Sequence, residues 1–126
     1  MGEAMTCLRL AALVTSIVTW VLPCAAMADS AQEEIDYLLD TVGHSGCTFV
    51  RNGTEHSASE AEAHLRLKYR KGAKYAKTAD DFIARLATQS SWTRQAYVIA
   101  CPDVPREPSG AWLSKRLADY RARPEP

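Results

Sequence analysis

Residues 47–69, CTFVRNGTEHSASEAEAHLRLKY, decide the fold, because a short strand, a tight turn, a helix cap and an amphipathic helix follow one another there. Residues 47–51 predict a strand with Cys47 and Phe49 on one face. The dipeptide Asn52-Gly53 favours a tight turn, since both residues tolerate positive φ. We therefore expect a hairpin here, or a turn that leads into the next helix.

The second half of this stretch predicts a helix over residues 58–71, ended by Gly72. Ser57 and Ser59 are alternative N-caps, because each has a glutamate three positions later, at Glu60 or Glu62. The apolar residues at helical spacing form the expected buried face: Ala58, Ala61, Leu65 and Tyr69.

The composition indicates one globular domain. The chain has 126 residues, of which 47% are hydrophobic and 24% charged, and its formal net charge is zero. A neutral chain has no general attraction for nucleic acid, so we expect no nucleic-acid partner.

The N-terminus resembles an export signal. Residues 10–22 are apolar apart from Ser and Thr, and this run is shorter than the roughly 20 residues that span a bilayer. Ala26 and Ala28 are the small residues that a signal peptidase reads, so cleavage is predicted between Ala28 and Asp29. This divides the chain into a signal peptide, 1–28, and a secreted domain, 29–126, of which 121–126 is expected to fray.

Three alternatives concern the same segment. The segment could remain as an uncleaved anchor, or Cys24 could carry a lipid, although a lipidated cysteine normally follows a small residue and here follows Pro23. Glu3 offsets the positive charge of Arg9, a defect that a start at Met5 would remove. After cleavage, no stable membrane span would remain.

Of the four cysteines, only Cys47 and Cys101 would stay in the exported domain. Export places them in an oxidising compartment, so a disulfide is expected between them. The chain-entropy model gives such a bond roughly 4 kcal/mol of stabilisation. A redox-active pair would normally have CxxC spacing, and a metal site would need two further ligands.

Helices are also predicted before and after the central stretch. Ser30 and Glu33 form a capping box for the first, whose apolar stripe ends at a left-handed Gly43. Thr78 caps a third helix that closes at Ser90-Ser91. Their core residues are expected to be Ile35, Leu38, Leu39 and Val42, then Phe82, Ile83, Leu86 and Ala87.

Residues 97–99 predict a strand that brings Cys101 next to Cys47, antiparallel to the first strand. The prolines at 102, 105 and 108 predict an extended connection, and Ser109 is the expected cap of a last helix. Its core face would comprise Trp112, Leu113, Leu117 and Tyr120. The predicted fold is a small α+β domain of about four helices with a short antiparallel two- or three-stranded sheet, closed by one disulfide.

Five short motifs follow one another along the domain: Cys47-x-Phe49-x-Arg51-Asn52-Gly53, His64-Leu65-x-x-Lys68-Tyr69, Phe82-Ile83, Tyr97-x-Ile99-x-Cys101 and Trp112-Leu113-x-x-x-Leu117. In order and spacing they resemble the domain of unknown function 5329, a family of small secreted bacterial proteins. The resemblance implies export and a shared fold, but no established activity or catalytic residues. The chain departs from the family pattern at residues 93–96, where a turn with Gly and Pro is expected before the Tyr.

Histidines and an acid at helical spacing raise the question of a metal site. His56, Glu60 and His64 are four residues apart, the spacing that metal ligands use on a helix. A cap at Ser57 or Ser59 would leave His56 outside the helix, and Glu60 with His64 alone would be too few ligands for zinc. We therefore expect no metal and no cofactor, and the alternative function is a small hydrolase or metal-dependent enzyme that uses Glu60 and His64.

Other nucleophilic arrangements have little support. A Cys-His pair is disfavoured because Cys47 is expected to be oxidised, and no Gly-x-Ser-x-Gly turn supports a Ser-His-acid triad. No catalytic residue is assigned.

The charge pattern is more informative. Six basic residues lie between Glu62 and Asp80 with no acid among them, whereas the first predicted helix carries only acids: the basic set is Arg66, Lys68, Arg70, Lys71, Lys74 and Lys77. They can be solvated helix faces, or an anion-binding surface for phospholipid head groups, a cell-wall polyanion or an acidic protein. Trp92, Trp112 and Tyr120 could form an aromatic platform for sugars, although the helical spacing of Trp112 predicts that it lies in the core.

Four polar residues of the central stretch have no role in a cap, turn or core: Arg51, Glu60, His64 and Lys68. With Lys71 and Lys74 they form the candidate binding set. The predicted function is a non-enzymatic periplasmic or secreted binding module that recognises an envelope component, or a periplasmic protein with an acidic surface, through this basic helix.

Overall fold

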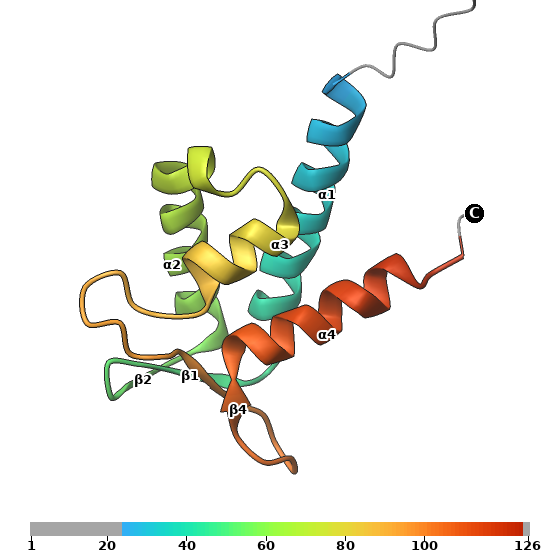
Figure 1. Cartoon of the computed structure of the whole chain (residues 1–126). Coiled ribbons are helices and arrows are strands. Elements are labelled where there is room, and N and C mark those ends of the chain that lie inside the picture. Colours follow the sequence, from blue (N-terminus) through green and yellow to red (C-terminus); the bar gives the residue numbers. More distant parts are fainter. Residues whose placement is uncertain (1–23, 125–126) are drawn as a thin grey trace, which may run out of the picture.

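The computed structural model describes residues 24–124, and Figure 1 shows their arrangement. Four α-helices occur in this part of the chain: α1 (Cys24–Gly43), α2 (Ala58–Gly72), α3 (Ala79–Phe82) and α4 (Ser109–Arg121). The strands are β1 (Thr48–Arg51), β2 (Thr54–His56), β3 (Val98–Ala100) and β4 (Glu107–Pro108). A 3₁₀ turn (Ala73–Tyr75) follows α2, and a π-helical turn (Ile83–Ala87) continues α3. The predicted α+β class is confirmed.

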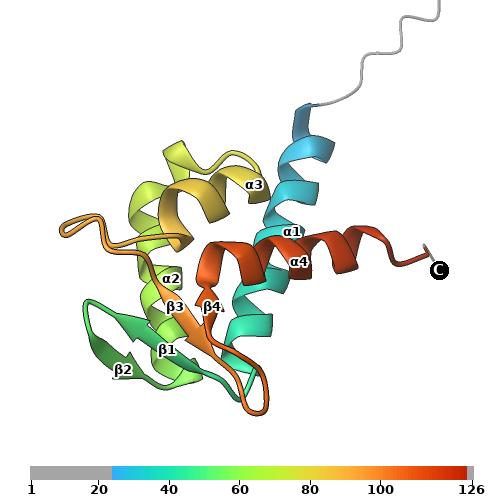
Figure 2. The same ribbon diagram turned by 60° about the horizontal axis from the view of Figure 1, so that its bottom comes forward.

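The sheet is antiparallel throughout, in the order β2-β1-β3-β4. Figure 2 shows the β1–β2 hairpin beside α2, and β4 leading directly into α4. The predicted two or three strands were too few, because β4 also pairs with β3, through Glu107 opposite Ile99. A two-residue strand that contains a proline has no sequence signature, yet Pro108 is tolerated because β4 is an edge strand.

The central stretch forms as predicted. Asn52 and Gly53 have φ values of 50° and 76° and make a two-residue hairpin turn closed by Arg51 opposite Thr54. Ser57, not Ser59, caps α2: the Ser57 hydroxyl accepts from the Glu60 amide at 3.2 Å, and the Glu60 carboxylate accepts from the Ser57 amide at 3.1 Å. The choice is fixed by β2, which ends one residue before Ser57.

The apolar stripes predicted for the helices meet in one core. Ile35, Leu38 and Val42 of α1 are fully buried, as is Leu113 of α4. Phe49 of β1 packs edge-to-face against Trp112, with ring centroids 6.4 Å apart. The strand that carries Phe49 is thereby fixed to α4.

The disulfide between Cys47 and Cys101 is present, with a sulfur–sulfur distance of 2.06 Å. The two cysteines flank the last residue pair of the β1–β3 ladder, Thr48 opposite Ala100. The bond closes the sheet at the end away from the hairpin turn, as expected from the antiparallel pairing.

The first helix differs from the prediction at both ends. It extends back to Cys24, so Ser30 lies inside α1 and not at its N-cap; the Ala-Ala-Met-Ala sequence at 25–28 favours helix. Gly43 ends α1, but the left-handed residue is Gly46, with φ 67°. A Cβ on Gly43 would lie 1.9 Å from a carboxylate oxygen of Glu62, so a larger residue here would require the flexible Glu62 side chain to move.

The expected cap of the last helix was also wrong. Ser109 is the first residue of α4, Pro108 occupies the N-cap position, and no side chain caps the helix. The Ser109 hydroxyl is buried without a hydrogen-bond partner in the described part of the chain.

Ion pairs join the helices to one another. Arg66 of α2 reaches Asp40 of α1 and Glu62 of its own helix, each at 2.7 Å. Arg121 binds Glu34 of α1 and Asp80 of α3, so the first residue of the tail expected to fray is held against two helices. No helix within residues 24–124 is long and apolar enough to cross a bilayer. The proposed signal core at 10–22 lies outside the described residues.

Candidate functional site

A surface groove of about 370 Å³ lies between α2, the hairpin turn and the loop formed by residues 88–97. It contains four of the six residues in the candidate binding set: Arg51, His64, Lys68 and Lys71. Its other lining residues are Asn52, Leu67, Ser90, Ser91, Trp92 and Tyr97.

The local structure explains why these side chains meet. His64, Lys68 and Lys71 follow one another at i, i+4 and i+7, and therefore share one face of α2. Arg51 is the last residue of β1, and Tyr97 immediately precedes the neighbouring strand β3. The pairing of β1 with β3 thus places Arg51 and Tyr97 together over the exposed end of the helix face.

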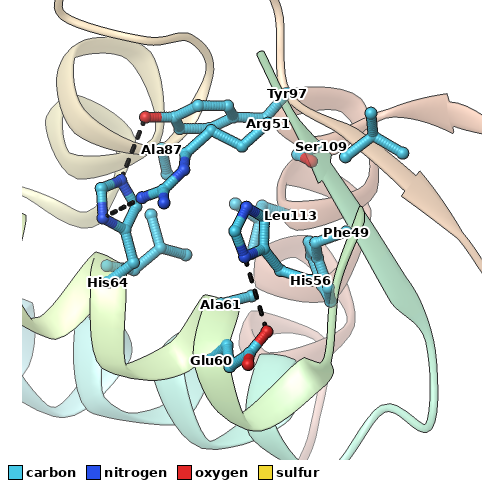
Figure 3. Close-up of a pocket in the computed structure, with 12 residues that line it drawn as sticks. Phe49, Arg51, His56, Glu60, Ala61, His64, Ala87, Tyr97, Ser109 and Leu113 are labelled. Carbon is cyan, nitrogen blue, oxygen red and sulfur yellow. Dashed lines mark hydrogen bonds and ion pairs between the residues drawn. The ribbon is translucent and has the colours of Figure 1, made fainter. Parts of the chain in front are cut away.

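A hydrogen-bonded chain joins these groups, and Figure 3 shows part of it. Arg51, which can only donate, donates to His64 Nδ1 at 2.5 Å. The other ring nitrogen, Nε2, must then carry the proton, and it donates to the Tyr97 hydroxyl oxygen at 3.3 Å. The Lys68 ammonium donates to the same oxygen and to the Gln89 carbonyl, both at 3.1 Å.

The environment shifts the pKa of three groups in this hydrogen-bonded network, His64, Lys68 and Tyr97. Burial, reinforced by the charges of Arg51, Lys68 and His56, lowers the pKa of His64 to about 4. Burial and the nearby Arg51 also lower the pKa of Lys68, and burial raises the pKa of Tyr97 against the opposing effect of Arg51. At neutral pH, His64 and Tyr97 are therefore neutral.

The groove is rich in donors and poor in acceptors. No carboxylate lines it, and Arg51, Lys68 and Lys71 make no ion pair within 4.0 Å among residues 24–124. The Tyr97 oxygen already accepts two hydrogen bonds, so its own proton is available to donate. This arrangement is suited to an anionic oxygen ligand, such as a phosphate or a carboxylate.

Glu60 and Lys74 lie elsewhere. The Glu60 carboxylate is 3.5 Å from His56 Nδ1, and no hydrogen bond or ion pair joins it to His64 in the described part of the chain. Lys74 lies over the Tyr75 ring, 4.9 Å from its centroid. The two residues of the predicted enzymatic alternative thus have different partners, although Glu60 and His64 both line the small cavity described next.

A small cavity of about 30 Å³ lies beneath the hairpin, separate from the surface groove, and Figure 3 shows His56 and Glu60 beside it. Its walls are mostly apolar, with Phe49, Ala61 and Leu113 among them. Within residues 24–124, no three His, Cys, Asp or Glu side chains are grouped as metal ligands. The cavity has room for a water molecule but not for a substrate.

The loop of residues 88–97 supplies the part of the groove that the sequence analysis missed. Trp92 on this loop is 95% exposed, and Leu67, which lines the same groove, is 40% exposed. Trp112 belongs to the core and Tyr120 packs against Tyr37, so Trp92, Trp112 and Tyr120 do not form the aromatic platform that the sequence allowed. A tryptophan in a wholly polar run, Ser-Ser-Trp-Thr-Arg-Gln, was the signal available in the sequence.

The fold and the groove define a small disulfide-closed α+β domain with a cation-lined surface site. Residues 29–121 match the model of the family of unknown function DUF5329, and the chain belongs to this family. The resemblance found in the sequence motifs is thereby confirmed. Over 89 residues the chain is 37% identical to the Uncharacterized protein YfeK of Salmonella typhimurium strain LT2, covering 68% of this chain and 74% of that protein. No solved structure matches the chain.

Proposed function

We propose that this protein is a non-enzymatic binding module of the periplasm that holds an anionic group of an envelope component in the groove. The observation that carries the proposal is the pairing of two cations, Arg51 and Lys68, around the neutral His64, with no carboxylate among the residues that line the groove. Two adjacent like charges repel each other, so an anion between them would be bound strongly.

Export is part of this proposal. The disulfide supports an oxidising compartment, because such bonds are rare in the cytosol. The family match begins at Asp29, the residue that follows the predicted cleavage site, which supports Ala28 as the end of a signal peptide.

The enzymatic alternative, a hydrolase or metal-dependent enzyme using Glu60 and His64, has less support from the geometry. Both ring nitrogens of His64 are occupied by Arg51 and Tyr97, and Glu60 is paired with His56. Glu60 and His64 both line the cavity of about 30 Å³, but that cavity is too small for a substrate.

Anion-dependent thermal stability tests the binding proposal. Inorganic phosphate, added to the purified protein at constant ionic strength, should raise the Tm, because a ligand that binds the native state stabilises it by about 2.7 kcal/mol at 100 times its Kd. In the double variant R51Q/K68Q the phosphate-dependent rise should disappear.

Arg70→Gln is the matched control. It removes one positive charge from α2, as K68Q does within the double variant, but Arg70 is exposed and does not line the groove. R70Q should keep the phosphate-dependent rise in Tm. An equal rise in wild type and R51Q/K68Q, or no rise in wild type, would contradict the proposed anion site.

A further inference from the structure

We propose that the anionic ligand is the surface of a phospholipid bilayer, with Trp92 inserted among the head groups and the groove cations bound to lipid phosphates. This inference rests on the proposed function and names the source of the anion. The observation behind it is that the groove combines unpaired cations with the most exposed large apolar side chain in the described part of the chain.

Trp92 is exposed because a well-ordered loop holds it outward. The Ser90 hydroxyl accepts hydrogen bonds from the amides of Trp92 and Thr93, each at 3.3 Å. Backbone bonds from Ser90 to the Gln95 carbonyl at 2.9 Å and from Arg94 to the Ser90 carbonyl at 3.0 Å close the loop. The conformation that presents the indole is therefore formed before any ligand binds, which lowers the entropy cost of binding.

The loop is also fixed to the hairpin. The side-chain amide of Asn52 donates from Nδ2 to the Ser90 hydroxyl at 3.4 Å, and the Thr93 hydroxyl donates to Asn52 Oδ1 at 2.5 Å. Trp92 and Arg51, which adjoins Asn52, consequently keep a defined spacing across the groove.

The apolar and basic groups continue past the loop. Ser91 borders both this groove and a second one lined by Tyr75, Arg85 and Arg94. Four large hydrophobic side chains are exposed in residues 24–124. Leu67 and Trp92 line the first groove and Tyr75 lines the second, whereas Val104 lies elsewhere. No acidic side chain lines either groove.

This mixture matches the chemistry of a bilayer surface. Trp and Tyr concentrate at the head-group level of membranes, and clustered Lys and Arg are attracted to anionic lipids. A protein partner would need a pocket shaped to receive the projecting indole, whereas the head-group region accepts such a ring without one. The acids of α1 that bind Arg66 lie on another face, so the charge distribution would orient these grooves toward an anionic membrane.

Vesicle flotation tests the inference. We expect the purified protein to float with phosphatidylglycerol-containing vesicles and not with pure phosphatidylcholine vesicles. Trp92→Ala should lower the partition coefficient roughly tenfold, because binding scales with the buried apolar area. Trp92 fluorescence should also shift to the blue on binding in the wild type.

Val104→Ala is the matched control, since Val104 is 58% exposed but distant from the two grooves in the fold. It should float like the wild type. Any N-terminal segment is common to all these proteins, so the difference between W92A and wild type reports the loop alone.

Two results would overturn the inference. If W92A floats as well as the wild type, or if the wild type does not float, the bilayer is not the ligand. When the phosphate-dependent rise in Tm nevertheless persists and depends on Arg51 and Lys68, the anion site stands, and its ligand is an acidic protein or a soluble anion. When that rise is also absent, the proposed function fails together with the inference.

Discussion

His64 lies between Arg51 and Tyr97 with both ring nitrogens hydrogen-bonded, and its pKa is lowered from 6.5 to about 4. Between these two pH values the unfolded chain binds a proton at this position that the folded protein does not. The free energy of unfolding therefore rises with pH across this window. His64 gives its full contribution above pH 6.5 and loses it as the pH falls toward 4.

This linkage predicts the behaviour of His64→Gln. Glutamine can accept a hydrogen bond from Arg51 and donate one to Tyr97 without titrating. Between pH 7 and pH 4.5, the free energy of unfolding of the variant should therefore fall by about 1 kcal/mol less than that of the wild type. This difference is small because the His64 ring is partly solvated. Urea unfolding at the two pH values measures the difference. His44→Gln removes an exposed imidazole and is the control. The assignment is wrong if H64Q and wild type show the same pH dependence.

The loop of residues 88–97 brings Trp92 to the groove, and its turn contains Arg94 in the left-handed backbone conformation. Arg94 has φ 62°, a conformation that costs most residues about 1–2 kcal/mol and costs glycine little. The family pattern was expected to have a turn with Gly and Pro here. Arg94 thus occupies, with some strain, a position for which glycine is better suited.

Comparison of Arg94→Gly with Arg94→Ala tests this strain. Both variants remove the charge, but only glycine relieves the positive φ, so R94G should be more stable than R94A by about 1 kcal/mol. Urea unfolding of the two proteins measures it. Equal stability, or a more stable R94A, would mean that the loop does not adopt this turn in solution.

Elements defined by nearby residues were predictable from the sequence. The hairpin at Asn52-Gly53 and the cap at Ser57 depend on contacts across at most three positions, and each is one of the two alternatives that the sequence predicted. Strand β4 and the buried hydroxyl of Ser109 depend on tertiary packing, which overrode the local signal for a cap.

Only part of the candidate site could be predicted from the sequence, because the rest of it also depends on tertiary packing. Arg51, His64 and Lys68 stood out because no cap, turn or core position required them. Tyr97, the common partner of His64 and Lys68, lies 29 residues beyond Lys68, and only the pairing of β1 with β3 brings it beside Arg51. Its periodicity and β propensity marked it as an ordinary strand residue.

At the scale of the whole molecule, the basic run between Glu62 and Asp80 is not one surface. Arg66 pairs with acids of α1, Lys68 and Lys71 line the groove, and Lys77 borders a third depression beside Asp80. A helix turns about 100° per residue, so neighbouring charges in sequence face different ways. The groove therefore obtains its positive character from residues spaced three and four apart, together with Arg51 of the sheet.

The proposed cleavage site between Ala28 and Asp29 lies within helix α1. The helix runs from Cys24 and crosses the peptide bond between Ala28 and Asp29. Cleavage there would remove the first helical residues and leave Ser30 near a new helix start. Ser30 and Glu33 could then form the capping box that the uncleaved helix does not need.

Mass spectrometry of the exported protein tests this processing, and we expect its chain to begin at Asp29. Ala28→Leu should leave uncleaved precursor, because the peptidase accepts only small residues at this position, whereas Ala25→Leu, at a position that it does not read, should be processed normally. In the processed protein, Ser30→Ala should lower the free energy of unfolding by about 1 kcal/mol, the usual cost of losing an N-cap. A different N-terminus would refute the cleavage site, and an unchanged stability of S30A would show that Ser30 does not become the cap when the helix is shortened.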